Sequence, residues 1–133
     1  NKNIKVRGSR DRIRDFLYVE DTAEALVMAL DNSKAFNQVY MLSSDSPVTV
    51  KELVDKILKH SNNTSMEVDV IDEVTPGDAF KFTANIDKIK KELGWYPKHS
   101  LDEGIKKYFD WINQVPVVED LSNYHPFKMR SSI

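Results

Sequence analysis

The chain has 133 residues, a formal net charge of −2 from 19 lysines and arginines against 21 acidic residues, and no cysteine. The charge balance argues against a nucleic-acid partner, which calls for a basic excess, and the missing cysteine excludes disulfides and suits a reducing, cytoplasmic location. The longest apolar run, "ALVMAL", is far shorter than the roughly 20 residues that span a bilayer, so no membrane partner is expected.

The first part of the chain predicts two short strands and a helix. Strand patterns occur at residues 3–6 and 16–19, and a helical pattern follows at residues 21–30. Asp21 and Glu24 have the spacing of a capping box, in which the N-cap residue and the residue three positions later satisfy each other's backbone donors. Asp21 is therefore predicted to be the N-cap of this helix.

The middle of the chain continues the alternation of strands and helices. A β-rich run at residues 38–44, "QVYMLSS", precedes a second capping box formed by Thr49 and Glu52. Apolar residues at helical spacing follow that box. Residues 66–71 then alternate apolar and acidic side chains, which is typical of a half-exposed strand.

A short helix is predicted at residues 86–93. Asn85 or Asp87 can cap its first turn, and Gly94 suits the left-handed conformation that ends many helices. The helix is therefore expected to stop sharply before the next segment.

The last helix is predicted at residues 101–112. Ser100 and Glu103 form the third capping box, and an apolar stripe follows. Residues 115–133 show no periodicity and are expected to form an irregular tail. Because strands and helices alternate throughout residues 1–114, the fold class is α/β in a single domain.

Few residues offer catalytic or metal chemistry. His60, His99 and His125 lack the spacing of metal ligands, and each is predicted to be structural or exposed. The four glycines lie too far apart to form a dinucleotide- or phosphate-binding loop. We therefore expect no catalytic residue, no metal site and no cofactor bound by this chain.

Arg14 is the first of two candidate binding residues. It lies just before the apolar run at residues 16–19, where its guanidinium can present a fork of donors that fits phosphate oxygens. The alternative is a surface ion pair between Arg14 and Asp11 or Asp15. The residues alone leave both interpretations open.

Asp78 is the second candidate. Pro76 and Gly77 fit the central positions of a type II turn, which would hold Asp78 rigidly as an acceptor for hydroxyl groups. A plain turn with a solvated aspartate fits the same residues equally well.

Taken in order, three segments resemble the extended short-chain dehydrogenase/reductase family, the NAD-dependent nucleotide-sugar epimerases and dehydratases. They are "RDFLYVEDTAEAL", "VYMLSSDSPVTVKELVDKI" and "TPGDAFKFTANIDKIKKELGWYPKHSLDEGIKKYFDWI". The resemblance covers about residues 4–114. It implies the C-terminal, substrate-binding portion of that fold, with a late Rossmann strand–helix unit and the rest of the Rossmann core missing.

The resemblance also implies roles for individual residues. Arg14 would contact the diphosphate of a nucleotide sugar, and Asp78 would contact the ribose, so the two residues are expected to converge on one cleft. Phe82 would lie near the sugar or the base, although a core role is an equally open alternative.

One position departs from the family pattern. Many relatives have a second arginine where this chain has Thr75, so half of the usual diphosphate clamp is missing. Arg12 and Lys81 are the candidate substitutes. The departure leaves the base and the sugar of the substrate undetermined.

The resemblance implies that the glycine motif and the catalytic Tyr-x-x-x-Lys pair of the family lie outside this chain, so NAD(P) belongs to the full-length parent. We therefore expect a protein that binds a nucleotide-diphosphate sugar without catalysing a reaction alone. Its partner would be the missing Rossmann portion or a second copy, docked on apolar surface at residues 25–30 and 39–42. The alternative is a small protein-interaction or regulatory module that keeps the fold.

Overall fold

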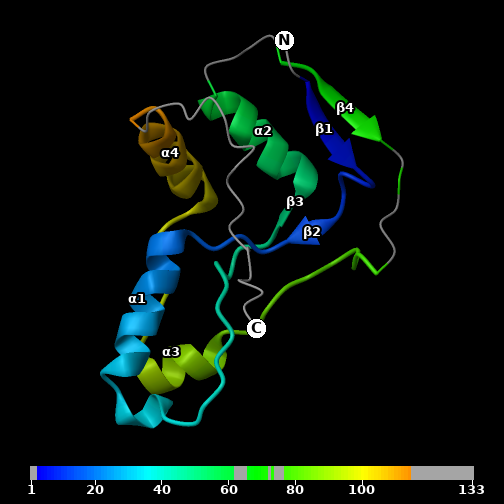
Figure 1. Ribbon diagram of the computed structural model, residues 1–133. Coiled ribbons are helices and arrows are strands. Elements are labelled where there is room, and N and C mark those ends of the chain that lie inside the picture. The colour runs from blue at the N-terminus through cyan, green and yellow to red at the C-terminus, as the bar shows by residue number, and fades with distance from the viewer. Residues whose placement is uncertain (1–2, 62–65, 72, 74–76, 115–133) are drawn as a thin grey trace, which may run out of the picture.

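The computed structural model describes residues 3–61, 66–71, 73 and 77–114 (Figure 1). In chain order the elements are β1 (Ile4–Arg7), β2 (Ile13–Arg14), α1 (Val19–Leu30), the 3-10 turn η1 (Ser33–Ala35), β3 (Val48–Thr49), α2 (Val50–His60), β4 (Val68–Ile71), α3 (Asp87–Leu93) and α4 (Leu101–Ile112). None of the helices in this part of the chain has the length and apolar character needed to cross a membrane.

Two small sheets organise the strands. β1 pairs in parallel with β4, in a register that places Ile4 opposite Val68. Because α1 and α2 lie between these two strands in the sequence, the pair forms a parallel β–α–β unit. β2 and β3 form a second, antiparallel pair. The α/β class and the strand predicted within residues 66–71 are confirmed.

The core lies between α1, α3 and the segment that follows α3. It contains Ala25, Ile86, Ile89, Leu93 and Trp95, all less than a tenth exposed. α1 and α3 accordingly lie side by side in Figure 1, while α2 packs against α4 on the other side of the molecule.

Two of the three predicted capping boxes are confirmed. Thr49 Oγ1 accepts a hydrogen bond from Glu52 N at 3.1 Å, and Glu52 Oε2 accepts one from Thr49 N at 2.7 Å. Ser100 and Glu103 make the same reciprocal pair at the start of α4. Gly94 ends α3 with φ at +72°, as the sequence predicted.

The prediction for Asp21 is wrong. α1 begins two residues earlier, at Val19, with Tyr18 as an N-cap that makes no side-chain capping bond. Residues 16–18 consequently form no strand, contrary to expectation. Asp21 lies inside the first turn and is only 1% exposed. Its carboxylate does not cap the helix, because it accepts a hydrogen bond from His99, far along the chain.

The cap of α3 is shared between two neighbours. Ile86 is the N-cap residue by conformation, and its side chain cannot accept a hydrogen bond. Asn85, one of the two predicted caps, accepts from Asp87 N through Oδ1 at 2.8 Å. The amide oxygen thus satisfies a first-turn donor from one position outside the helix.

The strand predicted at residues 38–44 is also absent from the described ladder. Tyr40 and Leu42 pack against the core, whereas Val39 and Met41 are 80% and 51% exposed. Buried and exposed side chains therefore alternate here as they do in a strand, but no described strand pairs with this segment. A strand in a parallel sheet needs such a neighbouring strand.

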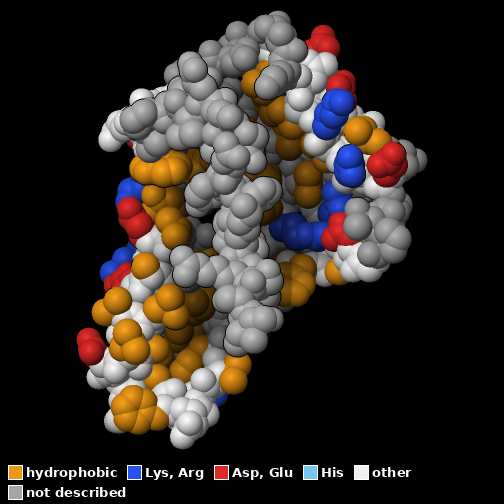
Figure 2. Space-filling view, in the orientation of Figure 1, with side chains coloured by type: hydrophobic (Ala, Val, Ile, Leu, Met, Phe, Trp, Pro, Cys, Tyr) orange, Lys and Arg blue, Asp and Glu red, His pale blue; other side chains and the backbone are white. Residues whose placement is uncertain are grey.

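An apolar surface surrounds this unpaired segment. Figure 2 shows hydrophobic side chains gathered over the part of the molecule that holds α1 and η1. The exposed residues include Val19, Leu26, Val27, Leu30, Phe36, Val39 and Met41. We call this set the α1 face; it contains the exposed apolar positions that the sequence predicted in residues 25–30 and 39–42.

Candidate functional site

The candidate site forms where β2 meets the segment after Gly77. Ile13 N donates to Phe80 O at 2.9 Å, and Phe82 N donates to Ile13 O at 3.1 Å, so residues 80–82 run alongside β2. Gly77 has φ at +83°, a conformation that glycine adopts without strain and that the predicted turn requires. Backbone pairing thus brings Asp78 next to Arg14 of β2 and to Arg12, which directly precedes this strand.

Asp78 lies between Arg12 and Arg14. Arg12 Nη1 pairs with Asp78 Oδ2, and Arg14 Nη2 pairs with Asp78 Oδ1, so each carboxylate oxygen is taken by one arginine. The three side chains are 18%, 23% and 26% exposed for Arg12, Arg14 and Asp78. The predicted proximity of Arg14 and Asp78 is confirmed, while their role toward a substrate stays a prediction.

Arg12 is fixed by backbone acceptors as well as by Asp78. Its Nε donates to Ser9 O at 2.9 Å, and its Nη2 donates to Arg7 O. Gly8, with φ at +73°, leaves the space for the guanidinium, because a Cβ there would lie 3.3 Å from Arg12 Cζ. Sequence reasoning missed Gly8; its signal was a glycine directly after a strand and four residues before an arginine.

Arg14 is held in a similar way. Its Nη1 donates to Ile13 O at 2.8 Å and to Phe80 O at 3.5 Å. The alternative pairing with Asp15 is not formed, because Asp15 Oδ1 accepts from the backbone N and the Oγ of Ser44. No ion pair joins Arg14 to Asp11 within the described residues either.

Lys81 and Phe82 lie on the same segment but differ in direction. Lys81 is the bridge partner of Ile13, and the alternation of extended backbone places Phe80 and Phe82 on the other face of this short segment. Lys81 makes no ion pair with any described residue. Phe82 is 56% exposed, so the core role considered for it is not what the structure shows.

The arginine cluster is partly exposed. A cavity of about 420 Å³ lies between residues 16–19, α2 and α4, and another of about 630 Å³ lies beside α4. Neither is lined by Arg12, Arg14 or Asp78. Arg14 and Asp78 therefore converge in a cluster whose side chains are about a quarter exposed or less, and this cluster lines neither of these two cavities.

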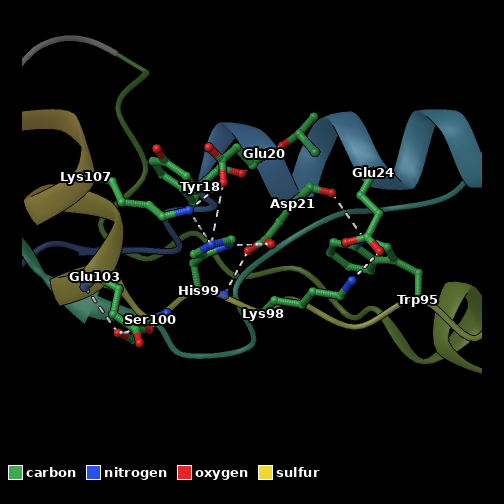
Figure 3. A network of polar contacts seen from close by, with 11 residues as sticks. Tyr18, Glu20, Asp21, Glu24, Trp95, Lys98, His99, Ser100, Glu103 and Lys107 are labelled. Atoms are coloured by element: carbon green, nitrogen blue, oxygen red, sulfur yellow. Dashed lines mark hydrogen bonds and ion pairs between the residues drawn. The ribbon is translucent and has the colours of Figure 1, made fainter. Parts of the chain in front are cut away.

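A second polar cluster, shown in Figure 3, joins the start of α1 to the segment before α4. His99 N donates to Asp21 Oδ2 at 3.1 Å, and His99 Nδ1 lies 2.8 Å from Asp21 Oδ1. Trp95 Nε1 donates to Asp21 O at 3.1 Å. Burial alone would raise the pKa of Asp21, but the hydrogen bonds from His99 outweigh it and lower that pKa.

The outer part of the same cluster involves α4. Lys107 Nζ lies 2.6 Å from Glu20 Oε2 and 3.0 Å from His99 Nε2, and the hydrogen bond to Glu20 raises the pKa of Lys107. Tyr18 packs its ring against His99, with centroids 4.9 Å apart. These contacts hold α1 and α4 together, so His99 is a structural residue as the sequence predicted.

A metal site or a dinucleotide site would need a particular arrangement of the described residues. No group of three or more His, Cys, Asp or Glu side chains is arranged to hold a metal among them. A dinucleotide cradle consists of a strand, a glycine loop and a helix N-terminus. Here β1 ends at Arg7, and Gly8 leads to β2 and not to a helix. The described residues therefore do not fit NAD.

Several predictions concern residues outside the described part of the chain: Thr75, where the second arginine is missing, Pro76 of the predicted turn, His125, and the tail at residues 115–133. One expectation is corrected by the sequence itself: a Tyr-x-x-x-Lys spacing does occur here, from Tyr124 to Lys128. Pro126 stands between the two, and a proline in a helix interior interrupts the helix that would bring them to one face. We assign this spacing no catalytic role.

Comparison with known proteins gives the fold its context. The family model described as GDP-mannose 4,6 dehydratase matches residues 1–108. The dTDP-glucose 4,6-dehydratase of Shigella flexneri is 31% identical over 117 residues, which cover 83% of this chain and 32% of that enzyme. The human dTDP-D-glucose 4,6-dehydratase is 29% identical over 134 residues, covering 96% of this chain and 35% of the enzyme.

A solved structure agrees with the sequence matches. The UDP-glucuronic acid 4-epimerase from Bacillus cereus, in complex with UDP-glucuronic acid and NAD, superposes with a TM-score of 0.76 at 25% identity, covering 85% of this chain and 36% of that one. The fold is thus that of part of a nucleotide-sugar-modifying enzyme. The chain belongs to the NAD-dependent nucleotide-sugar epimerase and dehydratase family and spans about a third of the length of these relatives.

Proposed function

We propose that this chain is the C-terminal, substrate-binding portion of an NAD-dependent nucleotide-sugar epimerase or dehydratase and does not catalyse the reaction alone. Arg14 contacts the diphosphate, and Asp78 contacts the ribose. The observation that carries the proposal is the convergence of Arg14 and Asp78, which are 64 residues apart in the sequence and form an ion pair. The Bacillus cereus relative, whose structure contains UDP-glucuronic acid, supports a nucleoside-diphosphate sugar as ligand.

The chemistry of the cluster suits a diphosphate. Two guanidinium groups face a single carboxylate, which leaves one net positive charge on a surface that remains about a fifth exposed. Planar guanidinium forks form paired, charge-assisted hydrogen bonds to phosphate oxygens. Phe82, more than half exposed and on the same face, provides an aromatic ring for the sugar or the base.

The partner in this proposal is the remaining two-thirds of the family fold, which holds NAD and the catalytic pair. In this proposal the missing part of the fold covers the α1 face, where Val39 and Met41 are exposed and the apolar side of α1 is uncovered. Contiguous exposed apolar surface of this kind marks an interaction site. We place the assembly in the cytoplasm.

Ligand binding by the 133-residue chain tests the proposal. Ligand-observed NMR with uridine, thymidine, guanosine and cytidine diphosphates is expected to detect binding with a Kd of about 0.1 to 1 mM for at least one of them. Arg14→Ala should weaken it about tenfold or more, because charge-assisted bonds are lost. The matched control is Arg10→Ala, which removes a guanidinium that is not paired with Asp78.

A second function is a small protein-interaction or regulatory module. The observation in its favour is that both oxygens of Asp78 are already taken by arginines, as in a purely structural ion-pair cluster. In that case no diphosphate binds, and Arg14→Ala lowers the free energy of unfolding without a binding phenotype. Unchanged diphosphate binding in Arg14→Ala would equally rule out the substrate-binding role.

A further inference from the structure

We propose that Asp78 is an internal competitor for the diphosphate: without ligand its carboxylate occupies the anion position between Arg12 and Arg14, and a bound diphosphate displaces it. Arg12 is then the second arginine of the clamp. This inference rests on the proposed function. It adds a role for Arg12 in binding the diphosphate, and it gives Asp78 one role before the ligand binds and another afterwards.

The geometry of the ion pairs carries the argument. Each carboxylate oxygen of Asp78 is bound by a different guanidinium, so Arg12 and Arg14 are held at a separation that two oxygens of one anion can bridge. Phosphate oxygens accept from the same donors as carboxylate oxygens. A diphosphate carries more negative charge than one carboxylate, and the cluster has one unneutralised positive charge to favour the exchange.

Arg12 is pre-positioned for this role independently of Asp78. Two backbone carbonyls, Ser9 O and Arg7 O, accept from its guanidinium, and Gly8 provides the space beside it. Releasing Asp78 therefore leaves Arg12 oriented, so little side-chain entropy is lost when an anion replaces the carboxylate. Lys81, the other candidate substitute, is the bridge partner of Ile13 and forms no described ion pair with Asp78, whereas Arg12 does.

Asp78 is free to accept from another group once it is displaced. A diphosphate seated on the two arginines places its attached ribose within the same surface, and ribose hydroxyls are donors for a carboxylate. Removal of the Asp78 charge should therefore strengthen binding of the phosphates and weaken binding of the ribose. Inorganic pyrophosphate, which has no ribose, separates the two effects.

The experiment compares pyrophosphate and uridine diphosphate on the full chain, its Asp78→Asn variant and an Asp78→Asn/Arg12→Ala double variant, by calorimetry at fixed ionic strength. Asp78→Asn is expected to raise pyrophosphate affinity about tenfold and to raise uridine diphosphate affinity less. Arg12→Ala should abolish the gain. Asp11→Asn, which makes the same change of net charge at an aspartate outside the ion pairs, should leave pyrophosphate affinity unchanged.

The outcomes separate this inference from the proposed function. If Asp78→Asn leaves pyrophosphate affinity unchanged or lowers it, while the wild-type chain binds uridine diphosphate through Arg14, competition by Asp78 is refuted and the substrate-binding role stands. If neither protein binds either probe, both fail. A gain that survives Arg12→Ala excludes Arg12 from the clamp.

A second variant covers the case in which Asp78→Asn does not fold. Arg12→Lys keeps the positive charge but lacks the paired fork, and we expect it to weaken pyrophosphate binding by the wild-type chain about fivefold. Unchanged affinity in Arg12→Lys would overturn the assignment of Arg12 as a clamp residue.

Discussion

The Asp78 and Asp21 clusters use the same chemistry in different surroundings. Asp78 is shared by two arginines on a partly exposed surface, whereas Asp21 is 1% exposed and receives both the backbone N–H and the ring of His99. A buried carboxylate with both oxygens hydrogen-bonded cannot exchange partners without a large desolvation cost, whereas a carboxylate that is about a quarter exposed can exchange them more easily. Exposure, and not the type of ion pair, therefore separates a structural cluster from a candidate binding site.

The largest effect is expected at the buried cluster. Asp21→Ala leaves the His99 ring and backbone N–H without their acceptor, and breaking such a buried pair costs about 3 kcal/mol or more of the free energy of unfolding. Urea denaturation at pH 7 measures it.

Glu20→Gln is the control, because it weakens only the outer ion pairs of Glu20 with Lys107 and with His99 Nε2, for which a small effect is expected. Comparable losses in Asp21→Ala and Glu20→Gln would contradict the distinction between buried and exposed pairs.

The error at Asp21 shows where sequence reasoning stops. Capping-box spacing is local, and it correctly located the starts of α2 and α4, where Thr49 and Ser100 have no competing partner. The carboxylate of Asp21 is instead bound by His99, 78 residues away, and no local pattern can reveal a contact of that range. Tertiary hydrogen bonding overrode the local signal.

The candidate site was predictable only in part. The order of the family-like segments placed Arg14 near Asp78, which the ion pair confirms. The role of Gly8 beside Arg12 depends on a backbone turn and on the pairing of β1 with β4, neither of which a residue pattern encodes. Likewise, residues 38–44 alternate as a strand does, but a ladder also requires a partner strand.

An intermediate effect is expected from the packing that supports the buried cluster. A Cβ at Gly104 would lie 3.0 Å from Tyr18 Cδ2, so Gly104→Ala pushes the Tyr18 ring against His99. Overpacking costs about 1–3 kcal/mol, and the better helix propensity of alanine offsets about 1 kcal/mol of that. We expect a net loss of about 1 kcal/mol in urea denaturation.

A double variant distinguishes steric pressure from other causes. In a Tyr18→Ala background the ring is gone, so Gly104→Ala should become neutral or stabilising. An equal loss in both backgrounds would show that Tyr18 is not the residue that excludes a side chain at position 104, and the packing of the Asp21 cluster would need another account.

The smallest effect on stability is expected at Asp102, a third aspartate, which pairs on the exposed surface between α2 and α4 with Lys59 and His60. The contact with His60, whose Nε2 lies 3.2 Å from Asp102 Oδ1, and the hydrogen bond from Lys59 lower the pKa of Asp102 from 3.8 to about 2. Because the pKa is lower in the folded chain, the stabilisation is fully present above pH 4 and is lost as the pH falls from about 4 to 2. Asp102→Asn should therefore be slightly less stable than the wild-type chain at pH 7, and the difference should shrink toward zero at pH 2.

An NMR titration of the Asp102 carboxyl carbon measures the midpoint directly, and a midpoint near 3.8 would show that these partners do not stabilise the charged form of Asp102. Asp55→Asn, which removes a carboxylate paired only within one turn of α2, controls for the general effect of losing a negative charge on that helix pair.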